Sequence, residues 1–248
     1  MRLHITGATG YLGSELVRRV PAASTERVEV RDAAAVEELL RRVRPQVVIH
    51  TAYLQDGPGA HEITVAGAEN VARAAAAVGA RLVHLSTDVV FDGRKGAPYV
   101  EDDPLSPATD YGRSKAEAEA RVARAHPEAV IVRTSLIYGG AEPSKHEVAA
   151  DDPGFTFYTN EIRNPVQVGD LAEALLELAE LDVSGPLHVA GADAVSRAEF
   201  AELITGAPVA SAPAPATRPL NCSLDSSRAR GMIRTGLRGV REVLARPG

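Results

Sequence analysis

Short apolar runs alternate with amphipathic stretches along the first half of the chain. Runs such as LVHL at residues 82–85 are bounded by turn residues and have the length of buried strands. The stretches between them repeat apolar residues at helical spacing, with charged residues on the opposite side. The predicted strands are Arg2–Thr6, Arg27–Val30, Gln46–Thr51, Arg81–Ser86 and Ala129–Thr134, and the predicted helices are Tyr11–Val20, Ala33–Val43, Val65–Val78 and Asp110–Ala125. This alternation predicts an α/β fold, a doubly wound parallel sheet with helices on both faces.

The pattern weakens beyond residue 138. Residues 139–154 are polar and broken by prolines, which predicts a loop or a short helix. The remaining predicted elements are strands Phe155–Thr159 and Pro186–Ala190, helices Asp170–Leu181 and Arg197–Ile204, and an extended connection at residues 211–219. We therefore expect two domains, with residues 1–138 carrying the sheet. Residues 139–248 are expected to form a smaller C-terminal α/β lobe, with the chain crossing back to the sheet.

Three glycines follow the first predicted strand. Gly7, Gly10 and Gly13 form a G-x-x-G-x-x-G motif that leads directly into a predicted helix. Gly7 allows a sharp turn, Gly10 lets the backbone approach a pyrophosphate, and Gly13 lets the helix lie close to the strand. An ordinary strand-to-helix turn is the alternative, but the spacing favours a Rossmann-like dinucleotide site. The other expected contacts to the dinucleotide are Tyr11, Leu12, Thr51 and Ala52.

Composition excludes several classes of protein. The 248 residues are 45% hydrophobic, enough for a real core, and no apolar run reaches the roughly 18 residues of a membrane helix. A net charge of −6 argues against nucleic acid as the main partner. The single cysteine, Cys222, excludes an intramolecular disulfide framework and is expected to be structural. Because the glycine motif lies so close to the first residue, a signal peptide has no room, and we expect a cytoplasmic protein.

The histidines show none of the spacings of a metal site. We therefore expect no catalytic metal. His50 and His84 lie inside predicted strands and are interpreted as satisfied core residues.

Two further stretches carry candidate chemistry. Tyr111 and Lys115 lie four residues apart near the start of a predicted helix and so share one face. A lysine ammonium near a phenol stabilises the phenolate and lowers a pKa that is otherwise about 10, so the tyrosine could exchange a proton near neutral pH. Ser86 and Thr87 follow at the end of the strand Arg81–Ser86, where ligands of open α/β sheets collect. A hydroxyl there could donate to a substrate carbonyl while Tyr111 delivers the proton. Taken singly, a solvated helix pair and a strand-ending turn are the alternatives.

The combination TGATGYLG, HLSTDVVFDG, YGRSK, VRTSLIYG and RPLNCSLDSSRA resembles the extended short-chain dehydrogenase/reductases, and within them the dTDP-4-dehydrorhamnose reductase branch. The similarity runs over almost the whole chain. It implies a Rossmann domain, a sugar-nucleotide lobe, and hydride transfer from NADPH or NADH to a keto group of a nucleotide-linked deoxysugar. The resemblance also implies Tyr111 as the acid and Lys115 as the residue that holds the nicotinamide ribose and assists Tyr111. Thr87 with Ser86 would orient the carbonyl.

The chain departs from the family pattern at four places. The segment before VEVRD is compressed, and there either Arg31 meets a 2′-phosphate of NADPH or Asp32 meets a ribose 2′-hydroxyl of NADH. Thr64 stands where the family usually has an active-site asparagine. Leu136 occupies a position often held by a substrate-contacting tryptophan, and residues 141–153 replace the helix that normally follows.

We expect a reductase that acts on a keto group of a nucleotide-linked deoxysugar or a related natural-product intermediate. An epimerase or dehydratase of the same fold is the alternative, and a 4,6-dehydratase is disfavoured because it would be expected to carry Asp-Glu where Asp88 is followed by Val89. A non-catalytic, cofactor-binding regulatory subunit is disfavoured because the candidate catalytic residues are intact. A small-molecule substrate is the expected partner, without nucleic acid or membrane, and a homodimer is left open. The expected substrate-binding residues are Asp88, Leu136, Arg163 and Arg218.

Overall fold

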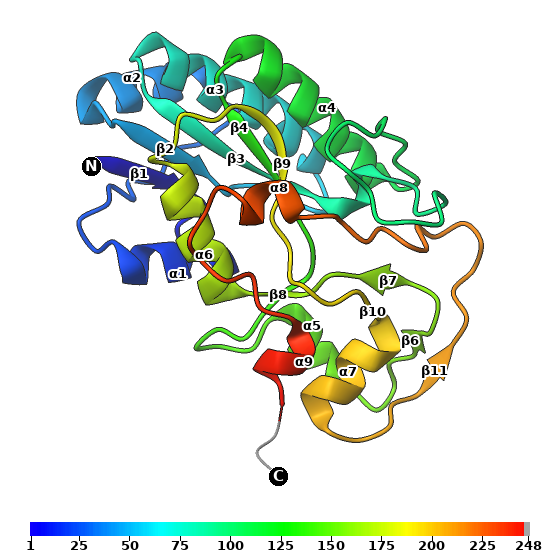
Figure 1. Cartoon of the computed structure of the whole chain (residues 1–248). Coiled ribbons are helices and arrows are strands. Elements are labelled where there is room, and N and C mark those ends of the chain that lie inside the picture. Colours follow the sequence, from blue (N-terminus) through cyan, green and yellow to red (C-terminus); the bar gives the residue numbers. More distant parts are fainter. Residues whose placement is uncertain (246–248) are drawn as a thin grey trace. The chain divides into compact units, whose positions relative to one another are not determined.

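The computed structural model describes residues 1–245, and the chain in it divides into two compact units, each built from three segments (Figure 1). Unit 1 contains Met1–Ser86, Asp110–Val132 and Leu175–Leu187. Unit 2 contains Thr87–Thr109, Arg133–Ala174 and the described residues from His188 onwards. These units are defined by packing alone, so the functional division at residue 138 stays a prediction.

A central parallel sheet organises unit 1. Within the described residues it has five strands in the order β1-β2-β3-β4-β9, and its Rossmann-like α/β class is the predicted one. Thr6 pairs with His50 and His50 with His84, so the first two strands end level with His84, and the third continues to Thr87. The strands are β1 Leu3–Thr6, β2 Val47–His50, β3 Arg81–Thr87, β4 Val130–Thr134 and β9 Gly185–His188.

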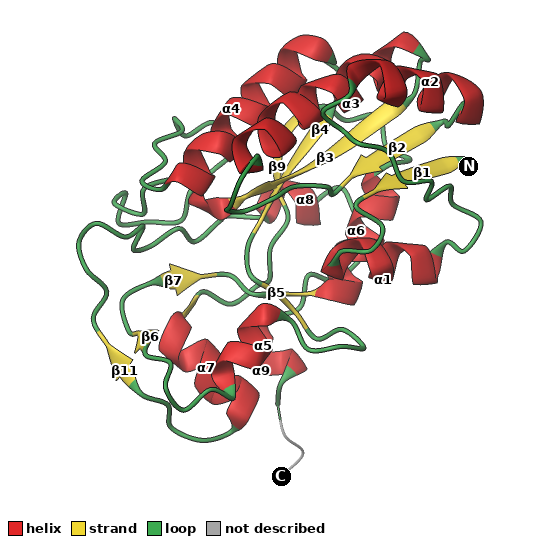
Figure 2. Cartoon of the chain, turned by 180° about the vertical axis from the view of Figure 1, so that it is seen from behind, coloured by secondary structure: helices red, strands yellow, loops and turns green. Residues whose placement is uncertain are grey.

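Helices cover both faces of this sheet (Figures 1 and 2). On one face, buried alanines of α3 pack with apolar residues of α2, α4 and the strands, because small side chains let these helices approach closely. One π-helical turn, η1 Glu62–Ala66, leads into α3. The helices on that face are α2 Ala33–Val43, α3 Gly67–Ala77 and α4 Asp110–Ala125. The other face carries α1 Tyr11–Arg19 and the end of α6 Val168–Leu178.

The strand predicted at Arg27–Val30 is wrong. These residues are fully described and form no strand, and within residues 1–245 the outer edge of β1 is paired at a single residue, Ser24. The Ile5 N–H donates to the Ser24 carbonyl at 2.9 Å, and the Ser24 N–H donates to the Leu3 carbonyl at 2.8 Å. Val30 instead packs so closely on Gly67 of α3 that a Cβ on Gly67 would lie 2.6 Å from the valine. Burial against the helix therefore overrides the strand propensity of this segment.

Unit 2 is built from short elements around two small apolar clusters. One cluster centres on Tyr138 and Phe200, and the other on Phe157 and Ala201. The strands form three two-stranded sheets, β5-β8, β7-β10 and β6-β11. The elements are η2 Asp88–Val90, β5 Ile137–Tyr138, α5 Lys145–Ala150, β6 Phe157–Tyr158, β7 Ile162–Arg163, β8 Val166–Gln167, β10 Val195–Ser196, α7 Arg197–Thr205, β11 Ser211–Ala212, α8 Ser227–Arg230 and α9 Val240–Val243.

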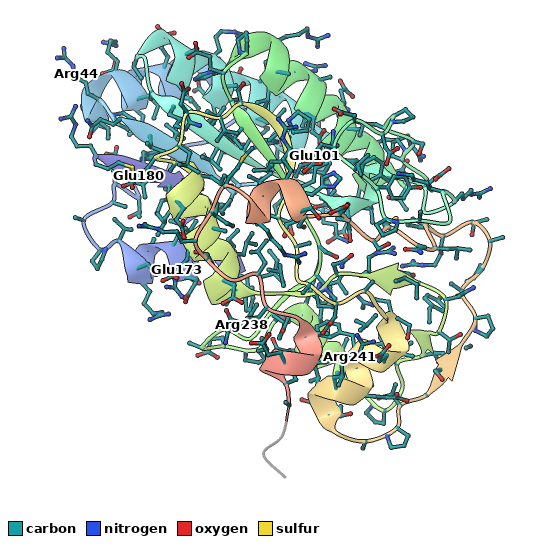
Figure 3. All side chains as sticks on the ribbon, viewed as in Figure 1. Arg44, Glu101, Glu173, Glu180, Arg238 and Arg241 are labelled. Carbon is teal, nitrogen blue, oxygen red and sulfur yellow. The ribbon has the colours of Figure 1, made fainter. Side chains whose placement is uncertain are left out.

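Ion pairs tie the last described segment to the rest of unit 2. Arg238 pairs with Asp170 at 2.7 Å, and Arg241 pairs with Glu199 at 2.5 Å; both arginines are labelled in Figure 3. Glu101, also labelled there, is buried and accepts the His188 N–H at 3.0 Å.

Two sequence motifs that lie far apart in the chain are joined by hydrogen bonds inside unit 2. The Asn221 N–H donates to the Gly93 carbonyl at 3.0 Å, which joins VFDG to RPLNC. The buried Cys222 thiol donates to the Phe91 carbonyl at 3.4 Å. Burial raises the pKa of Cys222 to about 12, which agrees with a structural thiol. Gly93 has φ +75°, and a Cβ there would lie 2.5 Å from the Leu220 nitrogen.

We predict that Gly93→Ala destabilises the protein by about 3 kcal/mol or more, because the left-handed backbone and a backbone clash both oppose a side chain. Gly96 is the matched control, since its φ is +77° but, apart from its own atoms and its two chain neighbours, no described atom lies within 4 Å of its Cβ position. Gly96→Ala is expected to cost only about 1 kcal/mol. Urea unfolding measures both, and equal losses would disprove the clash.

Candidate active site

The glycine loop between β1 and α1 is a closely packed cradle. Gly7 has φ +71°, and a Cβ there would lie 2.7 Å from the Ala52 nitrogen. A Cβ on Gly13 would lie 2.0 Å from the Gly7 carbonyl oxygen. Gly10 differs, because its Cβ position meets only that same oxygen, at 3.2 Å, among the described residues. The outer side of Gly10 is therefore open to a ligand, whereas Gly7 and Gly13 are required by the packing beneath.

The start of α1 is suited to an anion. No side chain among the described residues caps the helix at Gly10, and its first turn holds no acidic residue. Arg18 and Arg19 lie in the last turn, so the charge arrangement follows the helix dipole. From below, Thr51 donates its hydroxyl proton to the Thr6 carbonyl at 2.8 Å and holds the loop in place. This cradle fits a dinucleotide pyrophosphate, with Tyr11 and Leu12 in the first turn of α1.

Arg31 and Asp32 both have internal partners. The Arg31 guanidinium makes two hydrogen bonds to Glu29, at 2.9 and 2.8 Å, on the surface. Asp32 is the N-cap of α2 and accepts the Ala35 N–H at 3.0 Å. Asp32 therefore has a structural role that the sequence analysis did not foresee.

Lys115 is the buried cation of unit 1. Only 3% of the residue is exposed, and its ammonium donates to the Leu85 carbonyl at 2.5 Å. Burial lowers the pKa of Lys115 to about 8, while the carboxylate of Glu119 opposes that shift. Glu119 follows Lys115 by four residues on the same face of α4, a spacing that could have identified it in the sequence.

Ser86 donates its hydroxyl proton to Glu119 at 2.5 Å, so its donor already has a partner within unit 1. Thr87, where the chain enters unit 2, donates to Asp88 at 3.2 Å and caps η2. The structure thus gives Ser86 a link to the Lys115–Glu119 pair, and the carbonyl-orienting role predicted for both hydroxyls stays a prediction.

Tyr53 is a site residue that the sequence analysis missed. It lies three residues after the end of β2 and beside Tyr111, with ring centroids 5.8 Å apart. The Lys115 ammonium lies 5.6 Å from the centroid of the Tyr53 ring. Thr64 anchors the same loop by donating to the Leu54 carbonyl at 2.9 Å. Tyr53 lies in the loop after a parallel strand, where ligands of such sheets bind, and that position could have identified it in the sequence.

His50 and His84 are buried as predicted, but they are not satisfied. Their rings stack at 5.2 Å, and the Nδ1 of His50 shares a hydrogen bond of 2.6 Å with Thr6. Neither ring nitrogen of His84 has a partner within residues 1–245. Burial, reinforced by the charge on Lys115, lowers the pKa of His50 to about 3, and the pKa of His84 falls well below its usual value for the same reasons. Both imidazoles are therefore neutral at physiological pH.

In unit 2, Asp88 and Arg163 belong to a buried polar network. Asp88 accepts from Ser135 at 2.6 Å and lies 3.6 Å from Arg163. Arg163 also pairs with Glu161 at 3.1 Å and donates to the carbonyls of Ile162, Leu220 and Pro219. Burial raises the pKa of Asp88, and the charge of Arg163 opposes that shift. Internal partners surround this arginine, so its predicted substrate contact stays a prediction.

The other two substrate-side candidates of unit 2 are Arg218 and Leu136. Arg218 pairs with Glu161 at 2.8 Å, and 46% of its side chain is exposed. Leu136 packs against the Tyr138 cluster, so part of its side chain contributes to the core.

Two kinds of feature are absent from the residues that the structure describes. No helix among them is long and apolar enough to cross a membrane. No group of three or more His, Cys, Asp or Glu side chains in residues 1–245 is placed to hold a metal ion.

A family model described as the RmlD substrate binding domain matches residues 1–246. The chain belongs to this family. The dTDP-4-dehydrorhamnose reductase of Mycobacterium tuberculosis H37Rv, one relative in this reductase branch, is 38% identical over 220 residues, which cover 79% of this chain and 72% of that protein. The protein of the same name from Mycolicibacterium smegmatis is 34% identical and covers 98% of this chain and 84% of its own length.

Solved structures of the RmlD family share the fold. The dTDP-4-dehydrorhamnose reductase of Bacillus anthracis, solved in complex with NADP, has a TM-score of 0.87 and 27% identity. The match covers 98% of this chain and 95% of that one. The resemblance identified in the motifs is thus confirmed over nearly the whole length.

We predict that Lys115 makes stability depend on pH. The native state lowers its pKa from 10.5 to about 8, so between those values the unfolded chain binds more protons and stability rises with pH. The free energy of unfolding of the natural protein minus that of Lys115→Met is expected to increase by about 3 kcal/mol from pH 7 to pH 10.5. Urea unfolding at both pH values measures this difference, with Lys145→Met as the control at an exposed lysine. A constant or falling difference would contradict the burial of the charge.

Proposed function

We propose that this protein reduces a keto group on a nucleotide-linked deoxysugar, or on a related natural-product intermediate, using NADPH or NADH. The observation that carries the proposal is that unit 1 holds both the glycine cradle and the Tyr111–Lys115 helix. Membership of a family whose named members include dTDP-sugar reductases supports the same reaction.

The chain's own groups account for the proton. When bound, the nicotinamide cofactor supplies a hydride to the carbonyl carbon. Tyr111 donates its phenolic proton to the carbonyl oxygen, so its O–H bond breaks as the O–H bond of the alcohol forms. The ammonium of Lys115, one turn along α4, stabilises the phenolate that remains and would also hold the nicotinamide ribose. Thr87, aided by Ser86, would orient the carbonyl.

For the substrate side we propose Arg218, with Arg163, Asp88 and Leu136 shaping the surrounding surface. The exposure of Arg218 supports a contact to the diphosphate, because a guanidinium can pair with phosphate oxygens through two donors. We further propose a cytoplasmic location, in line with the single buried thiol of Cys222. A homodimer and the absence of a nucleic-acid partner stay predictions.

We expect Tyr111→Phe to lower turnover at least a thousandfold while the Kd for NADPH changes less than twofold, because the variant loses only the transferred proton. Turnover of a dTDP-linked 4-keto-6-deoxysugar is followed at 340 nm, and binding by nicotinamide fluorescence. Gly10→Val is the reciprocal control, since its side chain would fill the open side of the cradle and weaken binding.

Three results would contradict the proposed reductase activity. Unchanged turnover in Tyr111→Phe would remove the proposed acid. Cofactor binding without turnover in the natural protein would favour a regulatory subunit. Net epimerisation or dehydration of the sugar would favour the other enzymes of this fold.

We predict that Arg31 selects the cofactor. Arg31→Ala is expected to raise the Kd for NADPH about tenfold and to leave that for NADH unchanged, because its guanidinium is exposed beside Glu29 and could pair with a 2′-phosphate. Asp32→Asn is the comparison, since asparagine keeps the N-cap of α2 and removes the charge. A selective loss of NADH binding in Asp32→Asn, with no effect of Arg31→Ala, would reverse the assignment.

A further inference from the structure

Two tyrosines from different elements meet at the end of the sheet in unit 1. Tyr53 follows β2, and Tyr111 lies in the first turn of α4. Their rings are tilted by 41° with centroids 5.8 Å apart, and their phenols share a hydrogen bond. The proposed acid therefore has a second phenol as a neighbour.

The loop that carries Tyr53 is fixed in place. The Thr64 hydroxyl donates to the Leu54 carbonyl at 2.9 Å and accepts the Leu54 N–H at 3.3 Å. Thr64 itself is 1% exposed and lies in the π-helical turn η1, a feature that often marks functional sites. These two bonds clamp the residue next to Tyr53, so its phenol is held in position rather than left to a free loop.

Lys115 connects the two tyrosines electrostatically. Its ammonium lies 5.6 Å from the centroid of the Tyr53 ring, a distance at which a cation is attracted to the ring face. It also follows Tyr111 by one helical turn on α4. The cation, the ring and the phenol pair thus form one cluster inside unit 1.

In the neutral pair either phenol can donate to the other, because each phenol oxygen is both a donor and an acceptor. Shielding of the Tyr53 phenol raises its pKa, and the hydrogen bond with Tyr111 opposes that shift. When Tyr111 gives up its own proton, the Tyr53 O–H becomes a donor to the phenolate oxygen. A hydrogen bond to a charged oxygen is stronger than one to a neutral oxygen.

We propose that Tyr53 is a positioning residue for Tyr111: its phenol holds the Tyr111 oxygen in place and donates a hydrogen bond to the phenolate that proton transfer leaves behind. The role in turnover rests on the proposed function, whereas the phenol pair itself does not. Thr64, which stands where the family usually has an active-site asparagine, would act one step further out by holding the Tyr53 loop.

Few other titratable groups surround the pair. From α4, Asp110 and Arg113 form an exposed ion pair. His61, at the start of η1, pairs with Glu117 of α4 at 3.0 Å. The loop after β2 adds Asp56, which is exposed. Lys115 and Tyr53 are therefore the groups expected to dominate the titration of Tyr111.

The decisive experiment titrates Tyr111 directly. Full-length protein labelled with 13C at the tyrosine ζ carbon is followed by NMR, and the Tyr111 signal is identified by its absence in Tyr111→Phe. We expect Tyr53→Phe to raise the pKa of Tyr111 by about one unit, since it removes a donor to the phenolate and keeps the ring. Tyr138→Phe is the matched control, because the Tyr138 hydroxyl is buried in unit 2 without a partner among the described residues.

The same variants are assayed for turnover across pH. Reduction needs protonated Tyr111, so activity falls as pH rises through its pKa. In Tyr53→Phe this basic limb is expected to move about one unit higher, and it should stay in place in Tyr138→Phe. An unmoved or lowered Tyr111 pKa in Tyr53→Phe would overturn the proposal, as would a uniform loss of turnover at every pH with the limb unmoved.

The two failures can be told apart. If Tyr53→Phe shifts the NMR titration but the natural protein reduces no nucleotide-linked keto sugar, the phenol pair stands and the proposed function falls. If turnover depends on Tyr111 but the pKa of Tyr111 is the same in Tyr53→Phe and the natural protein, the proposed function stands and this inference falls.

Discussion

A buried ammonium is the constraint around which unit 1 is arranged. A charge removed from water needs compensation, and Lys115 obtains it from the Leu85 carbonyl, the carboxylate of Glu119 and the face of the Tyr53 ring. Each partner comes from a different part of the chain or a different turn of α4. Because all of them must be in place together, the same requirement that keeps the cation buried also positions the hydroxyl of Ser86 through Glu119.

The glycine cradle of the same unit combines closely packed positions with an open one. Gly7 and Gly13 are demanded by backbone atoms packed beneath them, whereas Gly10 is left open on its outer side. The loop is thus rigid where it meets the sheet and accessible where an anion would approach the start of α1. On the far side of β1, Ser24 pairs with the edge at His4. The segment from there to α2 is held by Val30 packing on Gly67 instead of by a further strand.

Local pattern predicted the regular parts of the fold well. The helix Asp110–Ala125 and the helix Ala33–Val43 have the predicted bounds, because each has a clear apolar face and a clear end. The strand predicted at Arg27–Val30 was wrong because Val30 is buried against α3, and that packing overrides the strand preference of β-branched residues. Short strands of unit 2, such as Ile162–Arg163, carry too few residues for any periodicity to show.

By itself the sequence determined the α/β class, the glycine motif with its dinucleotide interpretation, and the spacing that puts Tyr111 and Lys115 on one helix face. These follow from interactions between residues close in the chain. Only the tertiary structure decided that Tyr53 lies against Tyr111, that Glu119 binds Ser86, and that Arg163 is surrounded by internal partners. The first two contacts join residues 58 and 33 positions apart, and the third belongs to a buried network. A local sequence pattern does not predict which distant side chains will pack together in the core.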